Sequence, residues 1–189
     1  MIEIALYLSM AVPLLIGVTG VGVKLGRGIQ ATQVTRDVAH MYALGADFTL
    51  AGTQAIARKL ASGFDLTATG NAVLIFSRLT KVSQTDCTAA SLGNCPNLDQ
   101  PVFTQRILIG NSSLRSSTYG TPPAFYVGSQ GTIAAADYCS QSTLIATNFE
   151  HVISLAQDQV TWMVEGYFSV PQLSPFGSDS GGIHVRLLF

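Results

Sequence analysis

Charged side chains are scarce in this sequence. Only 11% of its 189 residues are Asp, Glu, Lys or Arg, against roughly 25% in an average soluble domain. The formal net charge is −1, and the ten Lys and Arg residues are spread along the chain. No basic stretch of the kind that binds nucleic acid is therefore present, and we expect no nucleic-acid partner. Ser, Thr, Gly, Asn and Gln take the place of Lys and Glu, a composition that favours a location outside the cytosol.

The sequence also lacks the short motifs of catalytic and metal sites. It contains no Gly-x-Ser-x-Gly stretch, and its three histidines, His40, His151 and His184, are far apart. No Cys-x-x-Cys or Cys/His spacing indicates zinc, and no Asp-x-Asp-x-Asp loop indicates calcium. We therefore expect no enzyme, no cofactor and no metal site. A Ser-His-Asp arrangement is left open by these observations, because such triads assemble from residues that are distant in sequence.

Cysteine is rare, with three residues in the chain. Cys87 and Cys95 bracket the short polar segment TAASLGN, which predicts a disulfide between them. Closing that loop is worth about 2–3 kcal/mol in the chain-entropy description and implies an oxidising compartment. The alternative is a pair of free thiols in a cytosolic loop. If the disulfide forms, Cys139 is left over, either buried and reduced or bonded to another subunit.

What the sequence does contain is a long apolar run at its start. From Ile4 to Val23 no residue is charged. As a helix with about 1.5 Å rise per residue, this run spans roughly 30 Å, the thickness of a bilayer core. Glu3 precedes it. A carboxylate at the centre of a membrane costs about 2.5–3.5 kcal/mol, so an acid in such a segment suggests a functional role. The alternative is a Glu that lies at the level of the lipid headgroups.

The charges around this run do not fit a secretory signal peptide, because no basic residue precedes it. Lys24 and Arg27 follow the run. By the positive-inside rule they place the rest of the chain in the cytoplasm, which conflicts with the predicted disulfide. The two predictions agree if a basic leader has been removed before Met1, and we adopt that hypothesis.

Pro13, Gly22 and Gly26 interrupt the apolar run or follow it closely. Pro13 lacks an N–H group and is expected to kink the helix or open it locally. Gly22 and Gly26 have the small-xxx-small spacing that lets two helices approach closely. The alternative is a flexible segment, since each glycine weakens a helix by up to about 1 kcal/mol. We take these three residues and Glu3 as the candidate assembly residues.

The remainder of the chain predicts an α+β fold. Residues 24–44 continue the helix, with an apolar stripe that contains Val34, Val38, Met41 and Tyr42. The other predicted elements are a helix over 50–61, strands over 71–82, 101–110, 159–171 and 182–189, short strands at 126–127 and 143–146, and a helical turn within 150–157. Alternation places Phe103, Ile107 and Ile109 on one face of their strand. We expect residues 1–44 to form an apolar helix and residues 45–189 a head whose antiparallel sheet packs against it.

The start of the chain, IEIALYLSMAVPLLIGVTGVGVKLGR, resembles that of type IV pilin-like proteins, and most of all the TadE-like pseudopilins of tight-adherence systems. The matching features are Glu3, Pro13-Leu14-Leu15, Gly17 or Gly20, and Lys24 or Arg27. The stretches QVTRDVAHMYALGADF and FTQRILIGNSSLRSSTYGTP also look like parts of TadE-like proteins. The likeness is strongest over the residues up to Leu50. One departure is the position of Glu3, because relatives usually carry this acid at the fifth mature residue.

The resemblance implies a structural subunit of an extracellular pilus filament, whose partners are copies of itself. Such subunits lose a short basic leader to a prepilin peptidase and wait in the inner membrane for the pilus assembly machinery. Glu3 would pair with an N-terminal amine and set the register between subunits, because a lone carboxylate in an apolar core is unfavourable. The alternatives are a minor or priming pseudopilin of a pilus or secretion machine, a membrane-anchored extracytoplasmic binding domain, and an anchored enzyme.

Overall fold

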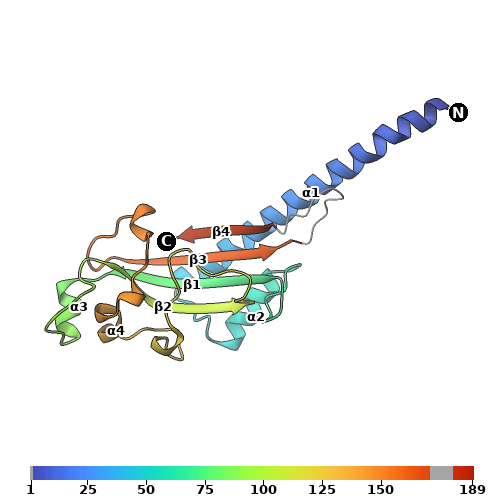
Figure 1. Cartoon of the computed structure of the whole chain (residues 1–189). Coiled ribbons are helices and arrows are strands. Elements are labelled where there is room, and N and C mark those ends of the chain that lie inside the picture. The colour runs from blue at the N-terminus through green and yellow to red at the C-terminus, as the bar shows by residue number, and fades with distance from the viewer. Residues whose placement is uncertain (1, 171–180) are drawn as a thin grey trace.

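The structure, a computed structural model, describes residues 2–170 and 181–189, and within the first turns it does not describe the side chains of residues 2–6, 8 and 9. The chain forms one long helix, α1 (Ile2–Ala43), and an α+β head (Figure 1). The N-terminal part of α1 projects away from the head, whereas its C-terminal part lies against the sheet. The predicted fold class is thereby confirmed.

The head is built on a four-stranded sheet in the order β2-β1-β3-β4, and all neighbouring strands are antiparallel. The strands are β1 (Ala72–Lys81), β2 (Pro101–Gly110), β3 (Val160–Ser169) and β4 (Gly182–Leu188). Each coincides closely with one of the four long strands that alternating apolar residues predict. Pro171, the predicted end of the third strand, lies outside the described residues.

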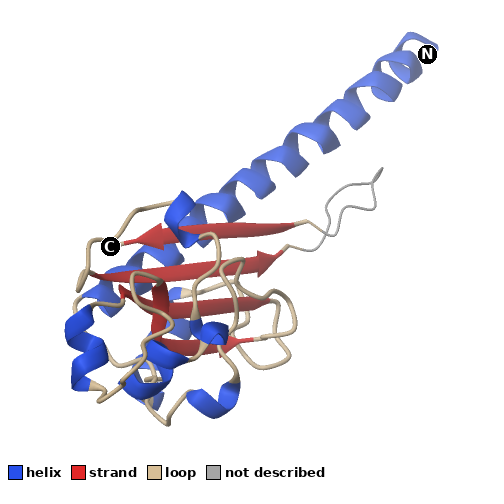
Figure 2. Cartoon of the chain, turned by 60° about the vertical axis from the view of Figure 1, so that its left-hand side comes forward, coloured by secondary structure: helices blue, strands red, loops and turns tan. Residues whose placement is uncertain are grey.

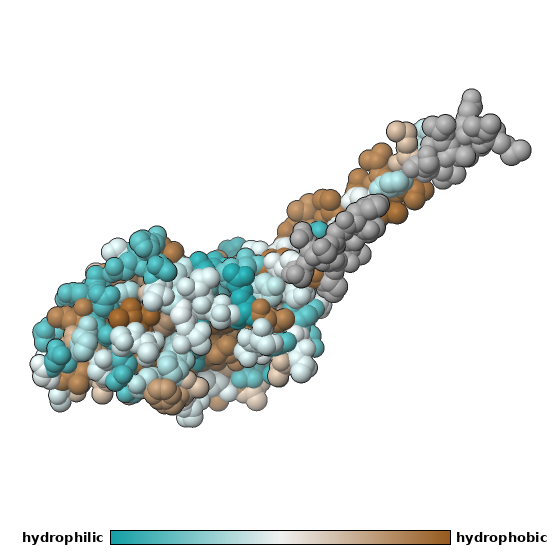
Figure 3. All heavy atoms as spheres, viewed as in Figure 1, coloured by the Kyte–Doolittle hydropathy of each residue, from teal (hydrophilic) through white to brown (hydrophobic). Residues whose placement is uncertain are grey.

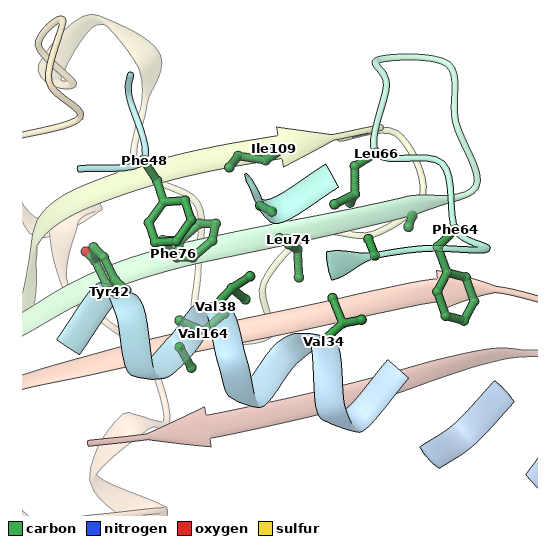
Figure 4. Close-up of a cluster of buried hydrophobic side chains, with 14 of the residues drawn as sticks. Val34, Val38, Tyr42, Phe48, Phe64, Leu66, Leu74, Phe76, Ile109 and Val164 are labelled. Carbon is green, nitrogen blue, oxygen red and sulfur yellow. The ribbon is translucent and has the colours of Figure 1, made fainter. Parts of the chain in front are cut away.

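One face of the sheet is covered by α1 and by α2 (Ala51–Leu60). The predicted apolar stripe of α1 is confirmed: Val34, Val38 and Tyr42 are at most 4% exposed, while Arg36 and Asp37 face solvent. Figure 4 shows these three side chains directed at the sheet. The residues they meet are Phe48, Phe64, Leu66, Leu74, Phe76, Ile109, Val164 and Phe168.

Helix α1 packs tightly against β3 at Gly166. A Cβ atom on Gly166 would lie 2.5 Å from Thr35 Oγ1 and 2.8 Å from Phe168 Cε2. Thr35 is fully buried, and its hydroxyl donates a hydrogen bond to the Ala31 carbonyl (2.8 Å). Only glycine fits this point of contact, because any larger residue would push the helix and the sheet apart.

The opposite face of the sheet is covered by loops and short helices, which Figure 2 shows gathered on one side of the strands. The short helices are α3 (Gln84–Ala89), η1 (Ala124–Tyr126), α4 (Ala135–Ser140), η2 (Ser142–Leu144) and η3 (Phe149–His151). The core of this side consists of Leu79, Phe103, Tyr119, Ile133, Leu144, Ala146, Phe149, Leu155 and Met163. The head therefore has two apolar cores, one on each face of its sheet.

The predictions for the segment between β2 and β3 were wrong in detail. The expected short strands at 126–127 and 143–146 are largely the 3-10 turns η1 and η2, followed by a single β-bridge between Val102 and Ile145. The predicted turn at 150–157 is the shorter η3. Helices α3 and α4 were not predicted at all, because six-residue helices offer too few turns for a periodic apolar pattern.

The predicted common face of Phe103, Ile107 and Ile109 is wrong for Phe103. The pairing of β1 with β2 shifts between Arg78 and Leu79, whose partners are Gln105 and Phe103. This β-bulge inserts one residue into β2 and reverses the alternation beyond it. Phe103 consequently lies in the core under the loops, while Ile107 and Ile109 face α1.

Candidate functional site

The projecting part of α1 carries an apolar surface that no other part of the described chain covers. Its large side chains are exposed by 45–80%. They include Tyr7, Met10, Val12, Leu14, Leu15, Ile16, Val18, Val21, Val23, Leu25 and Ile29. Figure 3 shows the apolar residues of this segment as brown spheres around the helix. Lys24 is an exposed charge within this stretch. An exposed apolar surface of this length marks a site that meets a membrane or another protein.

By length and composition, α1 qualifies as one membrane-spanning helix over Met10–Ala43. The residues from Ala31 onward belong to the core of the head. The apolar surface that remains free therefore ends near Ile29, close to the end of the predicted run at Val23.

Arg27 and Gln30 make the contacts with the head that lie next to the exposed part of α1. Arg27 Nη1 donates to Gln30 Oε1 (2.9 Å) and to the Gly63 carbonyl (3.4 Å), and its guanidinium carbon lies 5.5 Å from the centre of the Phe64 ring. Gln30 Nε2 donates to the Ser62 carbonyl. These contacts fix the direction in which the apolar segment leaves the head, because they hold the helix to residues 62–64, which follow α2.

Pro13 lies within α1, and the helix continues through it. The helix therefore does not end at this residue, and the expected kink or local opening stays a prediction. Pro13 lines an apolar groove on the helix surface together with Leu14, Gly17, Val18 and Val21. The groove exists because Gly17 has no side chain between its larger neighbours.

A second groove lies nearer the head and is lined by Lys24, Leu25, Gly28, Ile29, Thr32, Gln33 and Arg36. At Gly17, Gly22, Gly26 and Gly28 an added Cβ would meet nothing within 4 Å. The chain itself therefore does not require glycine at any of these positions. The predicted pair Gly22 and Gly26 lines neither groove. Gly28, which no sequence pattern indicated, lines the second.

Glu3 lies on the first turn of α1, and its side chain is outside the described residues. Its pairing with an N-terminal amine therefore stays a prediction. The assembly roles of Pro13, Gly22 and Gly26 stay predictions as well, since the structure contains a single chain.

The predicted Cys87–Cys95 disulfide is present. Cys87 lies on α3, whose first turn is closed by a capping box: the Ser83 hydroxyl accepts from the Asp86 N–H (3.2 Å), and the Asp86 carboxylate accepts from the Ser83 N–H (3.1 Å). Cys139 is a free thiol and fully buried. Of the two alternatives for this residue, the structure has the buried and reduced one.

A group of titratable side chains, Glu165, His184 and Arg186, lies on the sheet face under the loops. Glu165 is 2% exposed, and its Oε1 accepts from Arg186 Nη2 (3.3 Å) and lies 3.8 Å from His184 Nε2. Burial, and secondarily the charge of Arg115, lowers the pKa of His184, so this imidazole is neutral at pH 7. The described residues place no nucleophilic hydroxyl or thiol in hydrogen-bond contact with His184. The group therefore does not form a Ser-His-Asp arrangement within the described part of the chain.

The side chain of Arg106, which is on β2, lies on the same face of the sheet. It is 4% exposed, and it donates to Ser77 Oγ (2.6 Å) and to the Gly120 carbonyl (3.1 Å). Burial lowers its pKa to about 10, so the guanidinium is still charged at neutral pH. Sequence patterns did not reveal this role, because an arginine on an alternating strand is normally expected to face solvent.

Comparisons of the chain with protein-family models, with curated proteins and with solved structures give no match. A function for this chain therefore has to be inferred from its own residues, chiefly from the exposed apolar half of α1.

Proposed function

We propose that this chain is a structural subunit of an extracellular type IV pilus-like filament and that it polymerises through the apolar part of α1. The observation that carries the proposal is the exposed apolar surface between Tyr7 and Ile29. It lies on a helix whose other half is part of the core of the head, so the head is held at one end of the apolar segment. Many copies can then bring their apolar segments together and keep their heads outside.

The driving force for such assembly is large in water but smaller from a membrane. Burying a large aliphatic side chain contributes about 1.5–3 kcal/mol relative to water. Lipid is already apolar, so the transfer from a bilayer gains less, and close packing and polar pairs have to select the partner helix. The grooves at Gly17 and Gly28 offer places for side chains of a neighbouring helix.

Glu3 supplies the polar pair in this proposal. A carboxylate inside a bundle of apolar helices is strongly unfavourable unless a cation compensates it. The N-terminal amine of the same or a neighbouring copy is the nearest candidate, and the pair would fix the axial register between subunits. Before assembly the chain would be held in the inner membrane, after removal of a leader by a prepilin peptidase, and the pilus machinery would extract it.

The alternative that a specific observation favours is a membrane-anchored extracytoplasmic binding domain, because α1 is long and apolar enough to cross a bilayer. In that case the helix never leaves the membrane, and Glu3 lies near the headgroups. A minor or priming pseudopilin would use the same surface as the main subunit, and its low abundance in sheared filaments would distinguish it.

The test is electron microscopy of filaments sheared from the source cells, with N-terminal sequencing of their main protein. We expect a helical filament whose main protein is this chain, with Glu3 close to the N-terminus found by sequencing. The variant Glu3→Gln should reach the membrane but form no filaments. The matched control is Glu150→Gln, which changes an exposed glutamate of the head that pairs with Lys81 (3.5 Å). If both variants behave like the unaltered chain, and if this protein is found in no filament, the chain is a membrane-anchored domain and not a filament subunit.

A further inference from the structure

Three cysteines meet at one point under the loops of the head. The Sγ atoms of Cys87, Cys95 and Cys139 all lie within 4.8 Å of one another. Two of them form the disulfide, and the third is the free thiol of Cys139. The apolar residues Val82 and Val102 pack around these sulfur atoms. A thiol is therefore held within reach of a disulfide.

The neighbouring segments are tied together by hydrogen bonds that do not depend on the disulfide. The Asn97 N–H donates to the Cys139 carbonyl (3.2 Å). Asn97 Nδ2 donates to the carbonyls of Tyr138 and Gln141, both at 2.8 Å. The Tyr138 hydroxyl donates to Asp86 Oδ1 (3.4 Å), which connects α4 to α3. The three sulfur atoms would thus stay close together if the disulfide moved from one pair to another.

The three cysteines differ in their access to solvent. Cys87 and Cys139 are fully buried, whereas Cys95 is half-buried. The identity of the unpaired cysteine therefore decides whether the free thiol of the head is hidden or reachable from solution.

We propose that the Cys139 thiol exchanges with the disulfide, so that the bond moves from Cys87–Cys95 to Cys87–Cys139 and the free thiol moves from the core to Cys95. Cys139 first loses its proton, and its thiolate attacks Cys87 Sγ. A Cys139–Cys87 bond forms, the Cys87–Cys95 bond breaks, and the electron pair leaves on Cys95 Sγ, which takes up a proton from water. The head contains one disulfide and one thiol before and after the step, so no oxidant or reductant is needed.

The solvation of the leaving sulfur favours attack at Cys87 over attack at Cys95. The sulfur that leaves carries a negative charge, and water reaches the half-buried Cys95 but not the buried Cys87. The exchange is slow at neutral pH, because burial and the charge of Asp86 raise the pKa of Cys139 and keep the attacking thiolate rare. Its rate should increase as the pH rises.

The consequence is a modification site at Cys95. Once free, this thiol can react with a small disulfide such as oxidised glutathione or with a thiol-specific reagent, while Cys87–Cys139 ties α3 directly to α4. This inference concerns the head alone and does not depend on whether the chain forms filaments.

The full chain, kept folded in detergent without reductant, is incubated with iodoacetamide at mildly alkaline pH and digested with trypsin under non-reducing conditions. No Lys or Arg lies between Cys87 and Cys95, so the original disulfide stays within the single peptide 82–106. We expect a growing fraction in which this peptide carries the label on Cys95 and is joined through Cys87 to the peptide 116–186, which contains Cys139.

Two results would overturn the proposal: label on Cys139 with the 82–106 peptide unlabelled and internally bonded, or no label on the folded chain when the denatured chain takes up one label. The control is Cys139→Ala, which leaves no free thiol and should take up no label. The fluorescence of Trp162, the single tryptophan, reports whether that variant has folded. Label on Cys95 in this variant would show that the disulfide opens without Cys139 and would overturn the assignment of Cys139 as the attacking thiol.

Discussion

The guanidinium carbon of Arg186 lies 4.5 Å from the centre of the Tyr119 ring, and the same side chain binds the buried carboxylate of Glu165. Arg186 also donates to Thr118 Oγ1 (2.7 Å). From the other edge of the sheet, Arg106 donates to the carbonyl of Gly120. Two arginines on opposite edge strands thus hold the segment 117–120 over the sheet, where it has no regular secondary structure of its own.

Replacing Arg186 should destabilise the head, because it would leave the carboxylate of Glu165 buried without its partner. Breaking a fully buried ion pair costs about 3–5 kcal/mol. The Arg186 side chain is 28% exposed, so for Arg186→Met we expect a smaller loss of about 2 kcal/mol. Urea unfolding of the full chain in detergent, followed by Trp162 fluorescence, measures it.

The double variant Glu165→Met/Arg186→Met should recover part of the stability lost in Arg186→Met, because it removes the carboxylate that Arg186→Met leaves buried. The recovery is partial, since Glu165 also offsets the charge of the buried Arg106. The control is Arg58→Met, which changes an exposed arginine on α2. An Arg186→Met variant no less stable than this control would contradict the assigned role of the pair.

Gly166→Ala should loosen the contact between α1 and the sheet. The added methyl group would lie 2.5 Å from Thr35 Oγ1, and overpacking of this kind costs about 1–3 kcal/mol. Thr35→Ala removes that oxygen and should recover part of the loss in the double variant. Gly52→Ala on the exposed face of α2 is the control, since nothing lies within 4 Å of its added methyl; it should be neutral or stabilising. The same urea unfolding experiment compares the unaltered chain, Gly166→Ala, Gly166→Ala/Thr35→Ala and Gly52→Ala.

The head should lose stability in alkali through Tyr138. Burial, followed by the charge of Asp86, raises the pKa of Tyr138 from 10.0 to about 12. The folded chain therefore keeps the proton at a pH where the unfolded chain releases it, so stability is lost as the pH rises from 10 towards 12. In Tyr138→Phe this part of the loss should vanish, while overall stability falls through the missing bond to Asp86. Equal pH dependence of unfolding in both chains between these values would refute the prediction.

The head should lose stability in weak acid through His184. Its pKa in the folded chain is below the ordinary 6.5, chiefly because of burial and the charge of Arg115, with Arg186 adding to the effect and Glu165 opposing it. The unfolded chain then takes up a proton first, so stability decreases as the pH falls below 6.5 and levels off once the folded chain is protonated too. His184→Asn should show a flatter profile over this window. The difference between the two chains isolates His184 from the carboxylates that titrate at lower pH.

The grooves of α1 give a prediction about assembly that rests on the proposed filament. Gly17→Leu or Gly28→Leu fills a groove that would receive a side chain of the neighbouring helix. A steric cost of about 1–3 kcal/mol per contact would lower filament yield roughly tenfold to hundredfold. Gly52→Leu is the control on the exposed side of α2. The measurement is the number of sheared filaments seen by electron microscopy at equal expression of each variant. Yields equal to that of the control would show that neither groove takes part in assembly.

The elements whose apolar pattern is long and regular could be predicted from sequence. The four strands of the sheet and the stripe of Val34, Val38 and Tyr42 follow from side-chain periodicity alone. The Cys87–Cys95 disulfide follows from a short polar loop between two cysteines. The exposed apolar surface on α1 follows from the absence of charge after Glu3.

The features that depend on a few residues could not be predicted. One inserted residue in β2 places Phe103 on the sheet face under the loops, and no local sequence pattern indicates such a bulge. The capping box of Ser83 and Asp86 did leave a sequence signal before α3, which a search for helix starts would have found. The contact between Cys139 and the disulfide, like that between Arg186 and Tyr119, joins segments distant in sequence and becomes visible only in three dimensions.

The close fit of Thr35 against Gly166 has a mechanical consequence. Because α1 continues from its apolar segment into the core of the head without a hinge, a force along the helix axis acts directly on the interface between α1 and the sheet. The buried stripe of α1 would have to slide along the strands as one body, which loads all its contacts in shear at the same time. The side chain of Thr35, lodged against a glycine, acts as a stop against that sliding. Under tension the chain should therefore yield in one cooperative event and not by gradual peeling.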